Sequence, residues 1–123
     1  MTKRKVGISV VAMVSILMLS GGMAYSEEPV PLPEVPAEYA DKKMPAGWLT
    51  DAKVIEEGAL IYSGEVNPQV NCASCHGKDG KPVKKGARDF RDKAQMGRMS
   101  DAFWYWRVSE GVPKTKMKAW KSM

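Results

Sequence analysis

The chain has 123 residues, a size that allows one domain at most, and carries 19 Lys and Arg against 14 Asp and Glu. Three of the positive side chains, Lys3, Arg4 and Lys5, lie in a segment that we expect to be removed, so residues 26–123 hold 16 positive and 14 negative side chains, a net charge of +2. A nucleic-acid-binding domain needs a clearly basic surface, so this balance argues against that class.

Residues 1–26 have the pattern of a secretory signal peptide. A positive start precedes an apolar run from Val6 to Leu19, and small residues then suit cleavage after Ala24 or Ser26. The run is shorter than the roughly 20 residues that span a bilayer comfortably, so cleavage is favoured over the alternative, an uncleaved membrane anchor. We therefore expect a periplasmic or other extracytoplasmic protein, in an oxidising compartment.

Residues 27–47 are predicted to form an extended strap or linker. They hold five of the chain's eight prolines, and proline favours extended backbone over helix. We expect a surface wrap without chemistry of its own, with a tether to a membrane or partner as the alternative. Residues 48–123 would then form the functional domain.

The first helix of that domain is predicted to begin near Thr50 and Asp51, because either side chain can cap free backbone N–H groups. Its apolar residues recur near one face. Gly58 interrupts this face and costs about 1 kcal/mol relative to alanine. It therefore favours close approach of another backbone, although a tolerated weak point would explain it too.

The segment Cys72-Ala-Ser-Cys75-His76 contains both cysteines and the single histidine of the chain. This spacing is the attachment pattern of a c-type haem. On one helical turn, positions i, i+3 and i+4 share a face. Cys72 and Cys75 can therefore form thioethers to the two haem vinyl groups while His76 binds the iron, which predicts one covalent haem c.

Three alternatives to haem would use the same residues. A structural disulfide would leave His76 without a role, and a zinc ion would need a fourth protein ligand from a chain with no other Cys or His. A thioredoxin-like dithiol requires a strand-helix-strand context, and the sequence has no such pattern. Haem is the best interpretation.

A second helix is predicted after Ser100, which can cap it, with Gly111 and Pro113 marking its end. It carries four consecutive aromatic residues, 103–106, which suit either a core or the wall of a haem pocket. Arg107 follows them and fits a haem propionate, because a guanidinium matches carboxylate geometry. An ordinary surface arginine is the alternative.

From about Met44 onward the chain resembles the class I monohaem cytochromes c. The resemblance rests on Gly58 and Tyr62, on the motif at 72–77, and on Thr115-Lys-Met-Lys-Ala-Trp120, which is similar to the family's methionine loop Thr-x-Met-Pro-Ala-Trp. It implies a small all-α fold wrapped around one haem. It also implies axial ligation by a histidine and a methionine, and electron transfer as the activity.

The sixth iron ligand is also constrained by composition, because the chain has no second histidine and a thioether is a common partner of His in such haems. The methionines after the motif are Met96, Met99, Met117 and Met123. We expect Met117 to be the ligand, because it follows His76 by 41 residues, enough for the chain to cross the haem. The others would fill gaps in the core.

Two features depart from the family pattern. Lys118 stands where a proline often stiffens the methionine loop. Only six residues follow Met117, whereas the family closes with a further helix that packs against the first one near Gly58 and Tyr62. Three explanations remain open: a truncated chain, a partner that supplies the missing surface, or a weak methionine–iron bond.

Charge is distributed unevenly along the chain. Residues 26–66 have nine acidic and three basic side chains, a net of −6, whereas residues 78–98 have eight basic and three acidic ones, a net of +5. A basic face could steer the protein onto an acidic redox partner. Simple solvation explains the same pattern equally well.

The leading hypothesis is a periplasmic electron carrier that cycles Fe(III) and Fe(II) and is not itself an enzyme. The first alternative is an electron-transfer subunit of a larger membrane-associated respiratory complex. The second is a haem enzyme or sensor with an open distal site, although the chain has no distal histidine for acid–base chemistry. We expect redox proteins as partners, with no nucleic acid and no small-molecule substrate.

Overall fold

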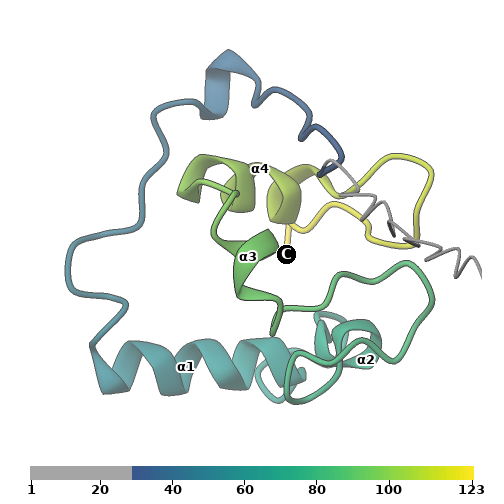
Figure 1. Ribbon diagram of the computed structural model, residues 1–123. Coiled ribbons are helices and arrows are strands. Elements are labelled where there is room, and N and C mark those ends of the chain that lie inside the picture. Colours follow the sequence, from purple (N-terminus) through teal and green to yellow (C-terminus); the bar gives the residue numbers. More distant parts are fainter. Residues whose placement is uncertain (1–28) are drawn as a thin grey trace, which may run out of the picture. The chain divides into compact units, whose positions relative to one another are not determined.

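A computed structural model describes residues 29–123, within which Pro31–Met123 form one compact unit (Figure 1). In chain order its elements are the 3-10 helix η1 (Ala37–Tyr39) and the helices α1 (Ala52–Ser63), α2 (Ala73–His76), α3 (Lys93–Met96) and α4 (Asp101–Glu110). Residues 29–123 contain no strand, which confirms the all-α class. The predicted signal segment, 1–26, lies outside the described residues.

Helix α1 begins where the sequence predicts. The Asp51 carboxylate accepts hydrogen bonds from the backbone N–H groups of Lys53 at 2.9 Å and Val54 at 3.3 Å, so Asp51 is the cap. Thr50 instead donates its hydroxyl to the Gly47 carbonyl at 3.2 Å. The helix ends at Gly64, whose φ of 83° is left-handed and suits glycine.

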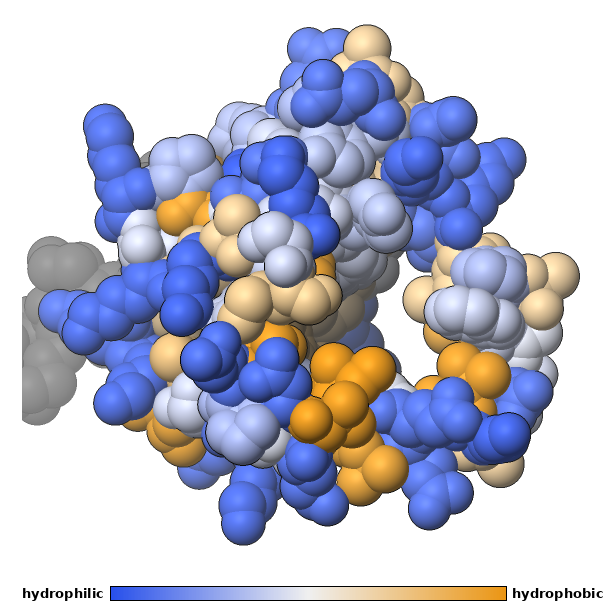
Figure 2. Space-filling view, turned by 180° about the vertical axis from the view of Figure 1, so that it is seen from behind, coloured by the Kyte–Doolittle hydropathy of each residue, from blue (hydrophilic) through white to orange (hydrophobic). Residues whose placement is uncertain are grey.

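The apolar face of α1 is open. Ile55 and Ile61 are 55% and 49% exposed, and Figure 2 shows hydrophobic side chains at the surface along this helix. Beyond the backbone of α1 itself, no atom of the described residues lies within 4 Å of the position that a Gly58 Cβ would take. The expected close approach of another backbone at Gly58 is therefore absent from this part of the chain, because no described segment packs over that face.

Helix α4 confirms the second predicted helix. The Ser100 hydroxyl accepts from the Phe103 N–H at 3.2 Å, and Gly111 with φ of 72° ends the helix. Ala102 and Phe103 are buried, as is Met99 just before the helix. The hydrophobic core of the described residues sits on this face of α4.

The strap packs against α4 (Figure 1). The segment is not extended throughout as predicted, because residues 37–39 form the turn η1, directly after Pro36. This turn buries the Tyr39 ring against Tyr105, with the ring centroids 6.1 Å apart. In the first turn of α4, the Asp101 carboxylate accepts a hydrogen bond from the Met44 N–H at 2.9 Å. The strap thus contributes to the core.

Helix α3 was not predicted from the sequence. It has four residues, too few for a periodic pattern, and is started by Asp92, whose carboxylate accepts from the Gln95 N–H at 3.1 Å. None of the helices within 29–123 has the length and apolar character to cross a bilayer.

Candidate functional site

The Cys-x-x-Cys-His motif lies on a single helical turn, as predicted. Cys72 has helical dihedral angles at the start of α2, and its carbonyl accepts from the N–H groups of Cys75 at 3.2 Å and His76 at 3.0 Å. The Asn71 carboxamide steadies this start by accepting from the Ser74 N–H at 2.9 Å. The two thiols and the imidazole therefore project from neighbouring positions of one turn.

Both cysteines are free thiols, half-buried, so no disulfide links them in this structure. Burial raises the pKa of the Cys72 thiol. Reactive redox dithiols need the opposite shift, since the thiolate is the nucleophile. The microenvironment of Cys72 does not resemble that of a thioredoxin-like site.

The His76 ring is held by a backbone carbonyl. Its Nδ1 lies 3.0 Å from the carbonyl oxygen of Arg88. A carbonyl oxygen can only accept, so Nδ1 donates in this contact, and the neutral tautomer that the contact favours has its lone pair on Nε2. Within the described residues Nε2 has no hydrogen-bond partner. A backbone carbonyl on one nitrogen is the usual way that proteins orient a metal-binding imidazole.

Phe90 covers one face of the His76 ring. The two rings are stacked, with centroids 4.3 Å apart and 13° between their planes. Phe90 also meets the rings of Tyr62 on α1 at 6.4 Å and Trp104 on α4 at 5.8 Å. Phe90 was not predicted from the sequence because it lies in an aperiodic loop, where no local signal distinguishes it from other apolar residues.

Gly77 connects the motif to α1. Its carbonyl accepts from the Tyr62 hydroxyl at 2.6 Å. Its φ is 78°, and a Cβ at this position would come within 1.9 Å of the Lys81 carbonyl oxygen. Only glycine fits both constraints. Tyr62 and Gly77 therefore fix the end of the turn that carries His76.

Met117 is half-buried in the loop that follows α4. Its carbonyl accepts from the Val112 N–H at 2.9 Å, and its N–H donates to the Thr115 hydroxyl at 3.1 Å. No hydrogen bond or ring contact joins Met117 to His76 among residues 29–123, and the bonds to Val112 and Thr115 order the loop. Met99 is 7% exposed in the core, which fits the packing role expected for it.

Arg107 lies against the aromatic residues of α4. Its guanidinium carbon is 3.8 Å from the ring centroid of Trp106 and 5.5 Å from that of Phe103. Burial lowers the pKa of Arg107, and the nearby charge of Arg88 lowers it further. In the described part of the chain no carboxylate forms an ion pair with Arg107.

Two further features bear on what the site can hold. No group of three or more His, Cys, Asp and Glu side chains in residues 29–123 is placed to bind a metal ion. A hollow of about 290 Å³ lies between α1 and α2, but its lining does not include Cys72, Cys75 or His76. The lining residues are Ala59, Leu60, Tyr62, Ser63, Glu65, Ala73 and Lys78.

No protein-family model matches the chain, and neither the curated proteins nor the solved structures include a match. The resemblance to the cytochromes c therefore rests on Gly58, Tyr62, the motif at 72–77 and the segment 115–120.

Proposed function

We propose that the protein is an electron-transfer protein that cycles a covalently bound c-type haem between Fe(III) and Fe(II). The observation that carries this proposal is the single helical turn of Cys72, Cys75 and His76, with Nδ1 of the imidazole directed to the Arg88 carbonyl. That hydrogen bond leaves Nε2 free for iron, and two free thiols on the same turn suit thioether bonds to a porphyrin.

In this proposal the haem-binding residues have different roles. Cys72 and Cys75 would attach the haem, and His76 and Met117 would bind its iron. The bound haem would supply a one-electron iron couple, whose reduction potential a methionine ligand raises. Phe90 would keep the His76 ring at a fixed angle through its 4.3 Å stack.

The surroundings suit an apolar macrocycle with acidic edges. Ile55 and Ile61 present exposed apolar surface on α1, and Trp104 extends the aromatic cluster from α4. Arg107, without a carboxylate partner among the described residues, would pair with a haem propionate. This arrangement would bind and orient a redox group.

Partners in this proposal are redox proteins of the periplasm or an equivalent compartment, reached through the signal segment 1–26. The basic segment 78–98 would steer an acidic partner, because long-range attraction raises association rates at low salt. Arg91 on this segment already pairs with Asp89 at 2.8 Å, so the remaining basic side chains would provide the attraction. Electron-transfer rates should therefore fall as ionic strength rises.

The direct experiment is expression of the full chain with export and haem-attachment machinery. We expect the purified protein to carry the mass of one haem after denaturation and to titrate reversibly as a one-electron couple. The Cys72→Ala, Cys75→Ala double variant should lose the covalent haem, whereas Ser74→Ala, between the cysteines, should keep it. Wild-type protein with two free thiols and no haem would contradict the proposal.

A second candidate, an electron-transfer subunit of a larger membrane-associated respiratory complex, is favoured by the exposed apolar side chains of α1. Ile55, Leu60 and Ile61 are each more than a third exposed, and such a surface suits a protein partner. Co-purification of the haem-loaded chain with defined partners from its native membrane would support this candidate. A monomer that exchanges electrons freely in solution would support the carrier.

A further inference from the structure

The Glu110 carboxylate joins three segments of the chain: the strap, the end of α4 and the residues after the methionine loop. It ends α4, accepts a hydrogen bond from the Tyr39 hydroxyl of the strap, and accepts another from the Lys121 ammonium group at 2.5 Å, near the end of the described chain. Tyr39 is 9% exposed and its bond to Glu110 is partly buried, whereas the Glu110–Lys121 pair lies at the surface.

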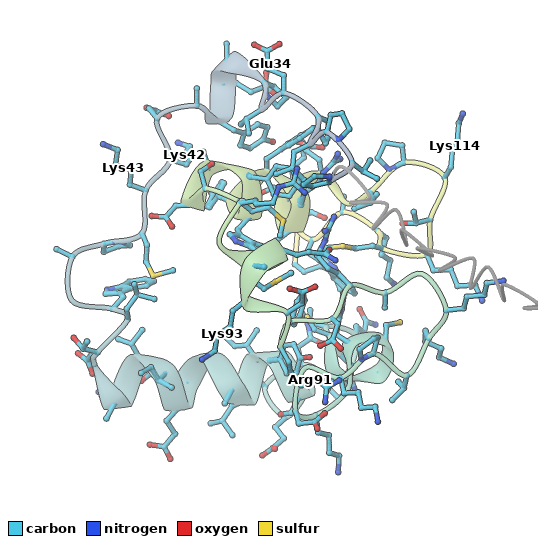
Figure 3. All side chains as sticks on the ribbon, viewed as in Figure 1. Glu34, Lys42, Lys43, Arg91, Lys93 and Lys114 are labelled. Carbon is cyan, nitrogen blue, oxygen red and sulfur yellow. The ribbon has the colours of Figure 1, made fainter. Side chains whose placement is uncertain are left out.

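The strap holds α4 at more than this one point. The Met44 N–H bonds Asp101 in the first turn of α4, whereas Tyr39 bonds Glu110 in the last turn. Between them the Lys42 ammonium lies 5.8 Å from the Tyr105 ring centroid. Figure 3 shows Lys42 beside α4 and Lys43 directed away from it. The strap therefore contacts α4 in its first turn, its middle and its last turn.

The methionine loop is anchored on the same last turn. The Trp120 N–H donates to the carbonyls of Val108 at 3.1 Å and Ser109 at 3.2 Å, and the Val112 N–H donates to the Met117 carbonyl at 2.9 Å. The loop from Gly111 to Trp120 thus leaves and rejoins the end of α4 around Glu110.

We propose that Tyr39 and Glu110 are positioning residues for Met117. Their hydrogen bond, the Tyr39–Glu110 clamp, fixes the end of α4 from which the methionine loop departs and to which it returns. This inference rests on the proposed function, in which the Met117 sulfur binds the iron. A loop held in one conformation loses less entropy when its methionine binds, so the clamp would favour the methionine–iron bond.

The protonation states suit this clamp at neutral pH. The hydrogen bond to Glu110 raises the pKa of Tyr39 to about 12, so the phenol remains a donor. Hydrogen bonds from Lys121 and then Tyr39 lower the pKa of Glu110, so the carboxylate remains an acceptor. Both partners are in the required form over the physiological range.

The test compares Tyr39→Phe with Tyr105→Phe in the haem-loaded protein. Both changes remove one hydroxyl from the same strap–α4 contact, and the Tyr105 hydroxyl has no hydrogen bond to a described residue. We expect the amide hydrogens of Val112 and Trp120 to exchange roughly three- to tenfold faster in Tyr39→Phe, the effect of losing one ordinary intramolecular hydrogen bond. Tyr105→Phe should match the wild type.

Ligation gives the second readout. If Met117 binds iron, the sulfur–iron band of Tyr39→Phe should also be lost at a lower temperature than in the wild type. Unchanged exchange of the Val112 and Trp120 amide hydrogens in both Tyr39→Phe and Glu110→Gln would overturn the proposed clamp, even if the sulfur–iron band were intact. A wild type without the band would instead reject the proposed ligand, and amide exchange would still decide whether the clamp holds the loop. If Tyr39→Phe does not fold, Glu110→Gln, which keeps an acceptor but not the charge, takes its place.

Discussion

The half of the molecule built from the strap and α4 contains every buried side chain of the described residues: Tyr39, Met99, Ala102, Phe103 and Ser109. Helices α1 and α2 bury none. The α1–α2 half is held instead by directed hydrogen bonds, from Tyr62 to Gly77 and from His76 to Arg88. Directed bonds fix geometry, but burial of apolar surface supplies most of the stabilisation of a fold. In the proposed function, the half that carries the motif would therefore depend most on the bound haem for its stability.

The largest effect is expected from removal of that group. The Cys72→Ala, Cys75→Ala double variant should lose covalent haem and be largely unfolded, because a small unit without a fully buried side chain has a marginal core. Any residual protection should lie in α4 and the strap. Circular dichroism during heating, with hydrogen exchange by segment, would measure this. A cooperative transition in the double variant, with α1 as protected as α4, would show that the two halves do not differ in their dependence on haem.

Gly77→Ala should have the next largest effect. An added Cβ would lie 1.9 Å from the Lys81 carbonyl oxygen at a residue with φ of 78°, so the backbone must move, at a cost of about 3 kcal/mol. Gly86→Ala is the matched control, because its φ is 87° and no described atom beyond its chain neighbours lies within 4 Å of the added carbon. It should cost only about 1 kcal/mol. Chemical denaturation of both haem-loaded variants gives the two free energies of unfolding, and equal losses would show that the Gly77–Lys81 contact is unimportant.

Gly58→Ala should stabilise the protein by up to about 1 kcal/mol, because alanine has the higher helix propensity and no described atom beyond the helix backbone lies within 4 Å of the added carbon. The change in thermal midpoint of the haem-loaded protein measures it. Destabilisation would show that another surface approaches α1 closely, as the sequence resemblance suggests. The experiment thus tests how open the α1 face is in the working protein.

The smallest effect is expected at Glu110 and depends on pH. Its pKa is lower in the folded chain than in the unfolded chain, so it stabilises the fold above its unfolded pKa of about 4.3 and loses this contribution as pH falls through the folded value. Wild type should therefore melt above Glu110→Gln near neutral pH, and the difference should shrink as the pH falls through the lowered pKa of Glu110 in the folded chain. A difference that stays constant with pH would exclude the carboxylate charge as its cause.

Sequence patterns were sufficient for the helices with local caps. Asp51 and Ser100 each bond backbone N–H groups two or three residues away, so the start of α1 and of α4 could be read directly. The turn of the motif was also predictable, because its spacing matches one helical repeat.

Long-range contacts could not be predicted in this way. Tyr39 and Glu110 are 71 positions apart, and nothing in either local pattern indicates the other. The carbonyl of Arg88 that holds His76 belongs to the backbone, so residue type does not reveal it. Phe90 is one apolar residue in an irregular loop, and its role follows only from its stack on the imidazole.

The most direct test of the central claim is the weak red absorption band of sulfur–iron ligation in the ferric protein. We expect the wild type to show this band, Met117→Ala to lose it, and Met96→Ala, which changes a half-buried methionine nearer the motif, to retain it. Absence of the band in the wild type, together with rapid binding of cyanide or carbon monoxide, would mean an open iron site. That result would contradict a six-coordinate electron carrier and favour a haem enzyme or sensor.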